Sequence, residues 1–211
     1  MKTFLTIFIL FIVSTVFSQS WCDPGANWKY DAMTFGIEGY TEIKYVGDTV
    51  IDGQSANILD KHSYVYDFIL SDYNDFDLGR DFTYAENGVV YVRYNNQWDT
   101  LYNFNAQVGD SWKMAKQPIT SACDTNNLLT VTATGTKVIN AVTLDYVVVD
   151  FSYSSTISDT IVEKIGFTGS YMLPYDLCEA QLDGNEGGPF RCYSDDNFTT
   201  YKPNFEESCD F

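Results

Sequence analysis

One stretch of the chain, residues 84–112 (YAENGVVYVRYNNQWDTLYNFNAQVGDSW), constrains the fold most strongly. Asn87-Gly88 predicts a tight hairpin turn, because both residues tolerate the positive φ that such a turn requires. Apolar and aromatic residues follow on both sides of a second turn signal, Asn95-Asn96, and Gly109-Asp110 marks a third turn before Trp112. Short strands joined by tight turns are typical of an antiparallel meander.

Strand signals recur at short intervals between Trp28 and Phe151, and no window has the spacing of an amphipathic helix. Gly47-Asp48 is expected to form a turn, and Gly135 is expected to end a strand. The run Val142–Phe151 is the most continuous apolar segment and predicts a central strand with both faces covered. The expected strands are 41–46, 49–51, 55–59, 63–70, 89–94, 97–104, 128–134, 142–151 and 160–165.

The N-terminus has the pattern of an export signal. Lys2 precedes an almost wholly apolar run from Phe4 to Phe17, and cutting after Ser18 places small residues at the two required positions. The apolar run is shorter than the roughly 20 residues that a membrane span requires. We therefore predict a signal peptide at 1–18, one domain at 19–211 and no membrane span after cleavage.

Composition and charge limit the range of possible functions. The chain carries a formal charge of −17, and 17% of its residues are aromatic, which is enough to build a large core. Nucleic acids and anionic membranes attract a positive face, so neither is an expected partner. The predicted fold is all-β: an antiparallel meander forming a sandwich or a strongly curved sheet, with little helix.

Five cysteines in an exported chain predict disulfides. Cys192 and Cys209 flank a short polar segment and form the preferred pair. Cys123 with Cys178 is the second choice, which leaves Cys22 unpaired near the start of the mature chain. Residues 177–211 are rich in Gly, Asp and Asn, so we expect a loop-rich tail that is tied by the disulfide.

Four motifs resemble a family of secreted Bacteroidota-type proteins. They are G-Y-x-x-I-x-x-x-G-D-T-x-I-x-G at 39–53, L-Y-N-F-x-x-x-V-G-D-x-W at 101–112, E-K-I-G-F-T-G-S at 163–170, and R-C-Y with C-D-F within 191–211. The resemblance implies no catalytic residues. Family members often carry a C-terminal sorting domain for the type IX secretion system, which is not expected here because the sequence ends at Phe211. The expected location is extracellular, cell-surface or periplasmic.

An acidic segment, residues 71–81, contains the closest spacing of oxygen donors. Such donors suit Ca²⁺, although the order does not fit an EF-hand loop. The alternative interpretation is an acidic surface loop between two strands. No other cofactor is expected. The candidate calcium ligands are Asp72, Asn74, Asp75, Asp77 and Asp81.

Catalytic patterns are weak. His62 is the single histidine, so it has no second imidazole for zinc, and no Gly-x-Ser-x-Gly elbow accompanies it. His62 could serve Ser63 or a more distant serine, but we expect no catalytic residue. A carboxylate pair for glycoside hydrolysis is always available among 29 acids, so composition alone does not indicate one.

Aromatic residues in the central hairpins suggest a glycan-stacking platform, with core packing as the alternative. The candidate ligand-binding residues are Tyr91, Tyr94, Trp98 and Tyr102. Three Asp-Thr-apolar tripeptides also resemble O-glycosylation sites of such exported proteins, and ordinary turn chemistry is the alternative. Their acceptors are Thr49, Thr100 and Thr160.

These observations predict a non-catalytic exported module that binds a glycan or an envelope protein. The alternatives are a carbohydrate-active enzyme with a carboxylate pair and a structural protein of the envelope. A flat exposed aromatic strip favours glycan binding, facing carboxylates in a cleft favour the enzyme, and a naked sheet edge favours protein assembly.

Overall fold

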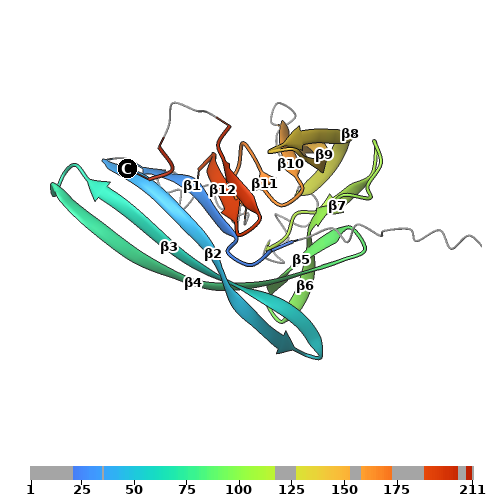
Figure 1. The fold of residues 1–211 in the computed structure, drawn as a ribbon, viewed down its shortest axis with the longest axis horizontal. Helices are drawn as coiled ribbons and strands as arrows, with labels where there is room; N and C mark the ends of the chain where they lie inside the picture. The colour runs from blue at the N-terminus through green and yellow to red at the C-terminus, as the bar shows by residue number, and fades with distance from the viewer. Residues whose placement is uncertain are drawn as a thin grey trace, which may run out of the picture.

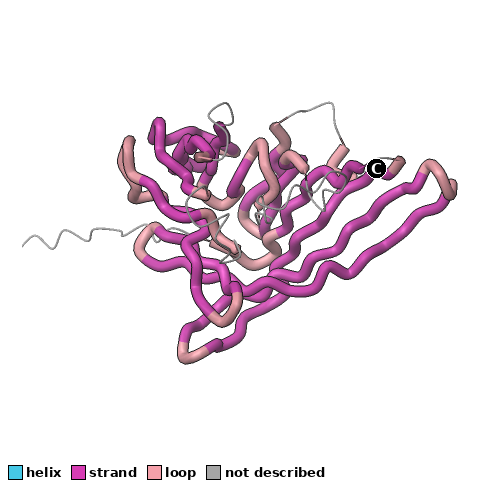
Figure 2. Tube along the Cα trace, turned by 180° about the vertical axis from the view of Figure 1, so that it is seen from behind, coloured by secondary structure: helices cyan, strands magenta, loops and turns pink. Residues whose placement is uncertain are grey.

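The computed structural model describes residues 21–34, 36–116, 127–152, 158–172, 188–203 and 208–210. This part of the chain is built from strands and contains no helix (Figure 2). The strands are β1 (Asn27–Thr34), β2 (Ile37–Ile51), β3 (Gln54–Asp67), β4 (Asp72–Glu86), β5 (Val89–Tyr94), β6 (Gln97–Asn103), β7 (Ser111–Lys113), β8 (Leu128–Ile139), β9 (Val142–Phe151), β10 (Ser158–Val162), β11 (Gly166–Phe167), β12 (Phe190–Asp195) and β13 (Phe198–Tyr201).

The described strands form two antiparallel sheets. An eight-stranded sheet has the order β13-β12-β1-β2-β3-β4-β5-β6, and a five-stranded sheet has the order β11-β10-β9-β8-β7. The larger sheet curls strongly, and its long strands β2, β3 and β4 extend well beyond the smaller sheet (Figure 1). The predicted all-β antiparallel fold with a strongly curved sheet is confirmed.

The core lies between the two sheets and includes aromatic side chains that connect them. Trp28 and Tyr102 are fully buried in the larger sheet. The Trp28 indole donates a hydrogen bond to the carbonyl of Lys164 at 2.8 Å, in the turn that follows β10. Tyr102 donates its hydroxyl to the carbonyl of Met172 at 3.0 Å and packs edge-on against Phe167 of β11. We call the face of the larger sheet that carries these side chains its inner face, and the opposite face its outer face.

The long hairpins depart from the predicted turn pattern. Gly47-Asp48 is not a turn: β2 continues through it with a register shift, and Gly47 has a φ of 141° that suits a bulge. The predicted strands 55–59 and 63–70 are a single strand, β3, which ends at Asp67. The predicted acidic loop at 71–81 is instead the first part of β4, because Asp72 already pairs with Asp67.

The smaller sheet corrects two further expectations. Gly135 does not end its strand: β8 runs through it and pairs it with Tyr146. A Cβ on Gly135 would lie 2.8 Å from the Tyr146 hydroxyl, so this position requires close approach of the backbone. β9 is central in its sheet, as predicted, but only one face is fully buried, because Val147 and Val149 are buried whereas Val148 is half-buried.

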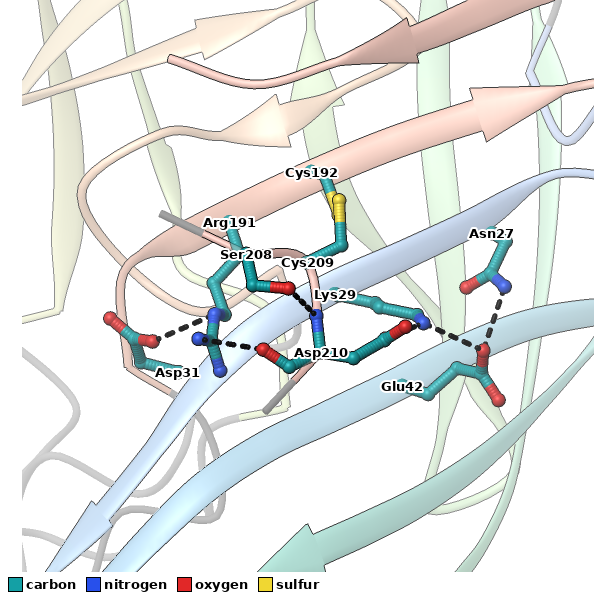
Figure 3. Close-up of a disulfide and its surroundings, with 9 residues drawn as sticks. All are labelled: Asn27, Lys29, Asp31, Glu42, Arg191, Cys192, Ser208, Cys209 and Asp210. Carbon is teal, nitrogen blue, oxygen red and sulfur yellow. Dashed lines mark hydrogen bonds and ion pairs between the residues drawn. A yellow bond between two sulfur atoms is a disulfide. The ribbon is translucent and has the colours of Figure 1, made fainter. Parts of the chain in front are cut away.

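Within the predicted loop-rich tail, the described residues include two strands. Strands β12 and β13 form a hairpin that adds to the larger sheet beside β1. The Cys192–Cys209 disulfide is confirmed (Figure 3). Beside it, Asp210 accepts a contact from the Lys29 ammonium, and its carbonyl accepts a hydrogen bond from Arg191.

The structure describes only one of the three remaining cysteines. The predicted Cys123–Cys178 pair lies outside the described residues. Cys22 is a free thiol in the described part of the chain, and it is buried rather than exposed at a loose terminus. Burial raises the pKa of the Cys22 thiol, so it stays protonated and unreactive.

Removing the confirmed disulfide should destabilise the fold. The double substitution Cys192→Ser and Cys209→Ser opens a link across a sequence separation of 17 residues. The chain-entropy model gives a loss of about 3 kcal/mol in the free energy of unfolding for a loop of this length. Urea unfolding of the variant and the wild-type protein measures this difference. A loss below about 0.5 kcal/mol, the usual range for surface changes, would contradict the expected role.

Candidate binding surface

The predicted glycan platform is divided between two faces of the larger sheet. Tyr91 and Trp98 lie on the outer face, where both are half-buried. Tyr102 points to the inner face and is 0% exposed. Tyr94 follows the inward-facing Val92 by two residues, so the alternation of a strand places it on the inner face as well. The four residues therefore do not form one strip.

A smaller aromatic cluster does form on the outer face, with a member that the sequence analysis did not select. Tyr84 of β4 stacks on Tyr91 with ring centroids 4.6 Å apart, and it meets Trp98 edge-on at 4.8 Å. The Arg93 guanidinium lies 5.3 Å from the Trp98 ring and forms an ion pair with Asp52 at 2.5 Å. Tyr84 with Tyr91, and Arg93 with Trp98, are directly paired across neighbouring strands, and such pairs stabilise a sheet.

The predicted calcium ligands are spread over both faces of β4. Successive side chains of a strand point to opposite faces, so Asp75 and Asp77 share the outer face, whereas Asn74 and Asp81 point inward. Within the residues that the structure describes, no group of three or more His, Cys, Asp or Glu side chains is arranged to hold a metal ion. The acidic spacing reflects a strand rather than a chelating loop.

Asp81 has two lysine partners on the inner face. Its carboxylate lies 2.8 Å from Lys61 Nζ and 2.9 Å from Lys116 Nζ, and only 8% of its side chain is exposed. Burial alone would raise the pKa of Asp81, but the two ammonium groups lower it below its usual value. This arrangement holds the carboxylate in its charged form.

His62 and Ser63 cannot act together, because they lie on opposite faces of β3. Ser63 is buried on the inner face, where Thr41 donates to it at 3.4 Å. His62 lies on the outer face between Asp60 and Asp75, at 3.6 and 3.5 Å, and stacks against Tyr64. The side chains of His62 and Ser63, which are adjacent in the sequence, are thus kept apart by the sheet.

Aromatic rings continue along the outer face of β2, β3 and β4. Tyr40 and Tyr64 lie 5.1 Å apart, and Lys29 places its ammonium 4.9 Å from the Tyr40 ring. Towards the end of β3, Tyr66 contacts both Phe68 and Tyr73, at 5.1 and 4.8 Å. The aromatic row leads to the turn that joins β3 to β4.

That turn carries the most exposed group of large apolar side chains in the described structure. We define the β3–β4 tip as Phe68, Ile69 and Leu70 of the turn together with Tyr73, the second residue of β4. Their exposed fractions are 56%, 69%, 72% and 69%. The tip lies at the far end of the long hairpins, away from the smaller sheet (Figure 1). Contiguous exposed apolar side chains of this kind mark interaction sites in soluble proteins.

Local hydrogen bonds fix the conformation of the tip. The Asp67 carboxylate accepts hydrogen bonds from the backbone N–H groups of Ile69 and Leu70, at 2.8 and 2.9 Å. The Phe68 N–H donates to the carbonyl of Gly36 at 2.8 Å. Gly36 has a φ of 77°, and a Cβ there would lie 2.9 Å from the Ile69 side chain. The tip is therefore held in place against the β1–β2 turn.

The tip is surrounded by negative charge. Residues 63–79 contain four aspartates and no lysine or arginine. Asp67 and Asp72 use carboxylate oxygens to accept backbone hydrogen bonds, as does Asp77 beside Gly79. The surface is thus an apolar tip with an acidic border, and its charge is complementary to basic surfaces.

The predicted modification sites all lie on strands rather than in turns. Thr49 lies on β2, Thr100 on β6 and Thr160 on β10, and each side chain is partly exposed. O-glycosylation at these residues remains a prediction.

Comparisons with known proteins give no assignment. The chain matches no protein-family model, no curated protein and no solved structure. Among the described residues, no helix has the length and apolar character required to cross a bilayer.

Proposed function

We propose that this protein is an exported, non-catalytic interaction module that binds a protein partner through the β3–β4 tip. The observation that carries the proposal is the presence of four large apolar side chains, each more than half exposed, at one projecting hairpin end whose turn is fixed by hydrogen bonds. Because the turn is fixed by its own hydrogen bonds, binding costs little conformational entropy. The location in the envelope or the exterior follows from the predicted signal peptide.

The chemistry of the tip defines the partner. An apolar pocket would bury Ile69 and Leu70, and burying one such side chain contributes about 1.5–3 kcal/mol. Lysine and arginine around that pocket would match the four aspartates and would speed association. If the partner is an abundant component of the envelope, binding to it would give this protein a structural role there.

Glycan binding is less well supported. The four residues of the predicted platform are divided between two faces, and the remaining outer cluster is engaged in ring contacts and an ion pair. The buried Asp81 carboxylate is paired with two lysines, which favours a structural role over acid–base chemistry. Both observations favour a protein ligand over a carbohydrate substrate.

Photo-crosslinking in the native cells tests the proposal. A photoreactive phenylalanine at position 73 should capture one protein, and the adduct should disappear when Leu70→Asp is added. Position 50 is the matched control. Val50 is also 69% exposed, but it lies beside the β2–β3 turn and not at the β3–β4 tip. An absence of protein adducts at position 73, or the same adducts at position 50, would contradict the proposal.

A further inference from the structure

A lysine that is largely shielded from water lies between two aspartates where the two sheets meet. Lys164 belongs to the turn between β10 and β11, Asp195 ends β12, and Asp23 precedes β1. The Lys164 ammonium contacts Asp23 Oδ2 and lies 3.2 Å from Asp195 Oδ2. The side chains of Lys164, Asp23 and Asp195 are 11%, 24% and 0% exposed. The three groups therefore meet in a site that is largely shielded from water.

Neighbouring groups fix the positions of the lysine and of Asp195. The Tyr193 hydroxyl donates to Asp195 Oδ2 at 2.6 Å, and the N–H of Asn197 donates to Oδ1 at 2.7 Å. The carbonyl of Lys164 accepts the Trp28 indole N–H at 2.8 Å. Phe198 covers the ammonium with its ring centroid at 6.0 Å. Reacting groups held in this way behave as if they were present at very high local concentration.

From this geometry we propose that Lys164 and Asp23 become joined by an intramolecular amide bond, with Asp195 relaying protons. The bond forms between Lys164 Nζ and Asp23 Cγ, and one C–O bond of the Asp23 carboxylate breaks. Asp195 accepts a proton from the ammonium, which frees the nitrogen lone pair for attack, and passes the proton to the departing oxygen. The two protons that the ammonium loses leave with this oxygen as one water. Atoms and charge balance without an oxidant or a cofactor.

Other lysine–carboxylate contacts in the described structure lack one of these features. Lys29 lies between Glu42 and Asp210, but the Asp210 side chain is 57% exposed, so water competes for both charges. Asp81 lies between Lys61 and Lys116, where the described ion pairs include no second carboxylate to relay protons. The Lys164 site combines burial with a second carboxylate.

The product would be a covalent link from the N-terminal segment to the turn after β10. Asp23 lies immediately before the first strand of the larger sheet, and Lys164 lies between two strands of the smaller sheet. The link would close a loop across both sheets, which would slow unfolding of an exported protein that must resist proteases.

Mass spectrometry of the exported, full-length mature protein tests the proposal. After reduction of the disulfides, the intact mass should be lower than the sequence mass by one water. After proteolysis, the peptides that contain Asp23 and Lys164 should be found as one branched species. Recovery of these peptides as separate species would overturn the proposal, whatever the stability of any variant.

Variants distinguish the roles of the two aspartates. Asp23→Ala should restore the full mass, whereas Asp23→Asn should still form the link but lose one ammonia in place of water. Asp195→Asn keeps the size of the side chain and should leave the protein folded but without the link. Complete linkage in Asp195→Asn would overturn the relay role, and an intact mass for Asp23→Asn equal to its sequence mass would argue against nucleophilic attack at Cγ.

Discussion

Asp81→Asn should lower the free energy of unfolding by about 3–5 kcal/mol, because it removes a buried carboxylate and leaves two largely buried ammonium groups without their counter-charge. The side chains of Lys61 and Lys116 are only 12% and 18% exposed, so water replaces the lost carboxylate only in part. The matched control is Asp75→Asn on the same strand, where the aspartate side chain is 65% exposed. The control should change stability by less than about 0.5 kcal/mol. Denaturant unfolding at neutral pH measures both values.

The free energies of unfolding of wild type and of Asp81→Asn should also depend differently on pH. Burial raises the pKa of Asp81, but Lys116 and Lys61 outweigh burial and hold it below its usual value in the folded state. A carboxylate with a lowered folded pKa contributes stability that is fully present above the unfolded pKa of about 4. This stability is lost as the pH falls through the folded pKa. The difference between wild type and Asp81→Asn should therefore shrink on acidification. A difference that grows below about pH 4 would contradict the ion-pair account.

Trp28→Ala should also cost about 3–5 kcal/mol, the usual range for truncating a buried tryptophan. Trp28 is 0% exposed, packs against Trp21 and Tyr193 at 5.5 and 5.1 Å, and donates to the carbonyl of Lys164 across the two sheets. The matched control is Trp98→Ala on the outer face, where the ring is half-buried and the loss should be smaller. Equal losses for the two variants would contradict the assignment of Trp28 to the core.

The sequence predicted the class of fold because strand alternation and turn residues are local signals. Asn87 and Asn95 do adopt positive φ at the turns they predicted, 49° and 46°. Local signals failed where a glycine serves a sheet rather than a turn. Gly47 allows a bulge and Gly135 allows the close approach of Tyr146, and both requirements depend on the neighbouring strand.

The candidate binding surface was only partly predictable from the sequence. The alternation of Tyr64, Tyr66 and Phe68 on one face was visible in the sequence, but the exposure of Ile69 and Leu70 was not. Apolar residues usually pack inward, so the sequence alone gives no reason to expect Ile69 and Leu70 to be exposed. They project into solvent because of the strand lengths and the Asp67 hydrogen bonds, which only the fold reveals. The opposite error occurred for Tyr102, because an extra residue in β6 shifts the register between Val90 and Tyr91.

The affinity of the captured protein for wild type and for Leu70→Asp tests the central claim most directly. Leu70 is 72% exposed in the free protein. Losing its burial in the complex, about 1.5–3 kcal/mol, predicts a dissociation constant raised about 10-fold or more. Val50 is 69% exposed and lies beside the β2–β3 turn, so Val50→Asp should bind the partner as tightly as wild type does. Equal affinities for Leu70→Asp and wild type would contradict the assignment of the β3–β4 tip as the binding site.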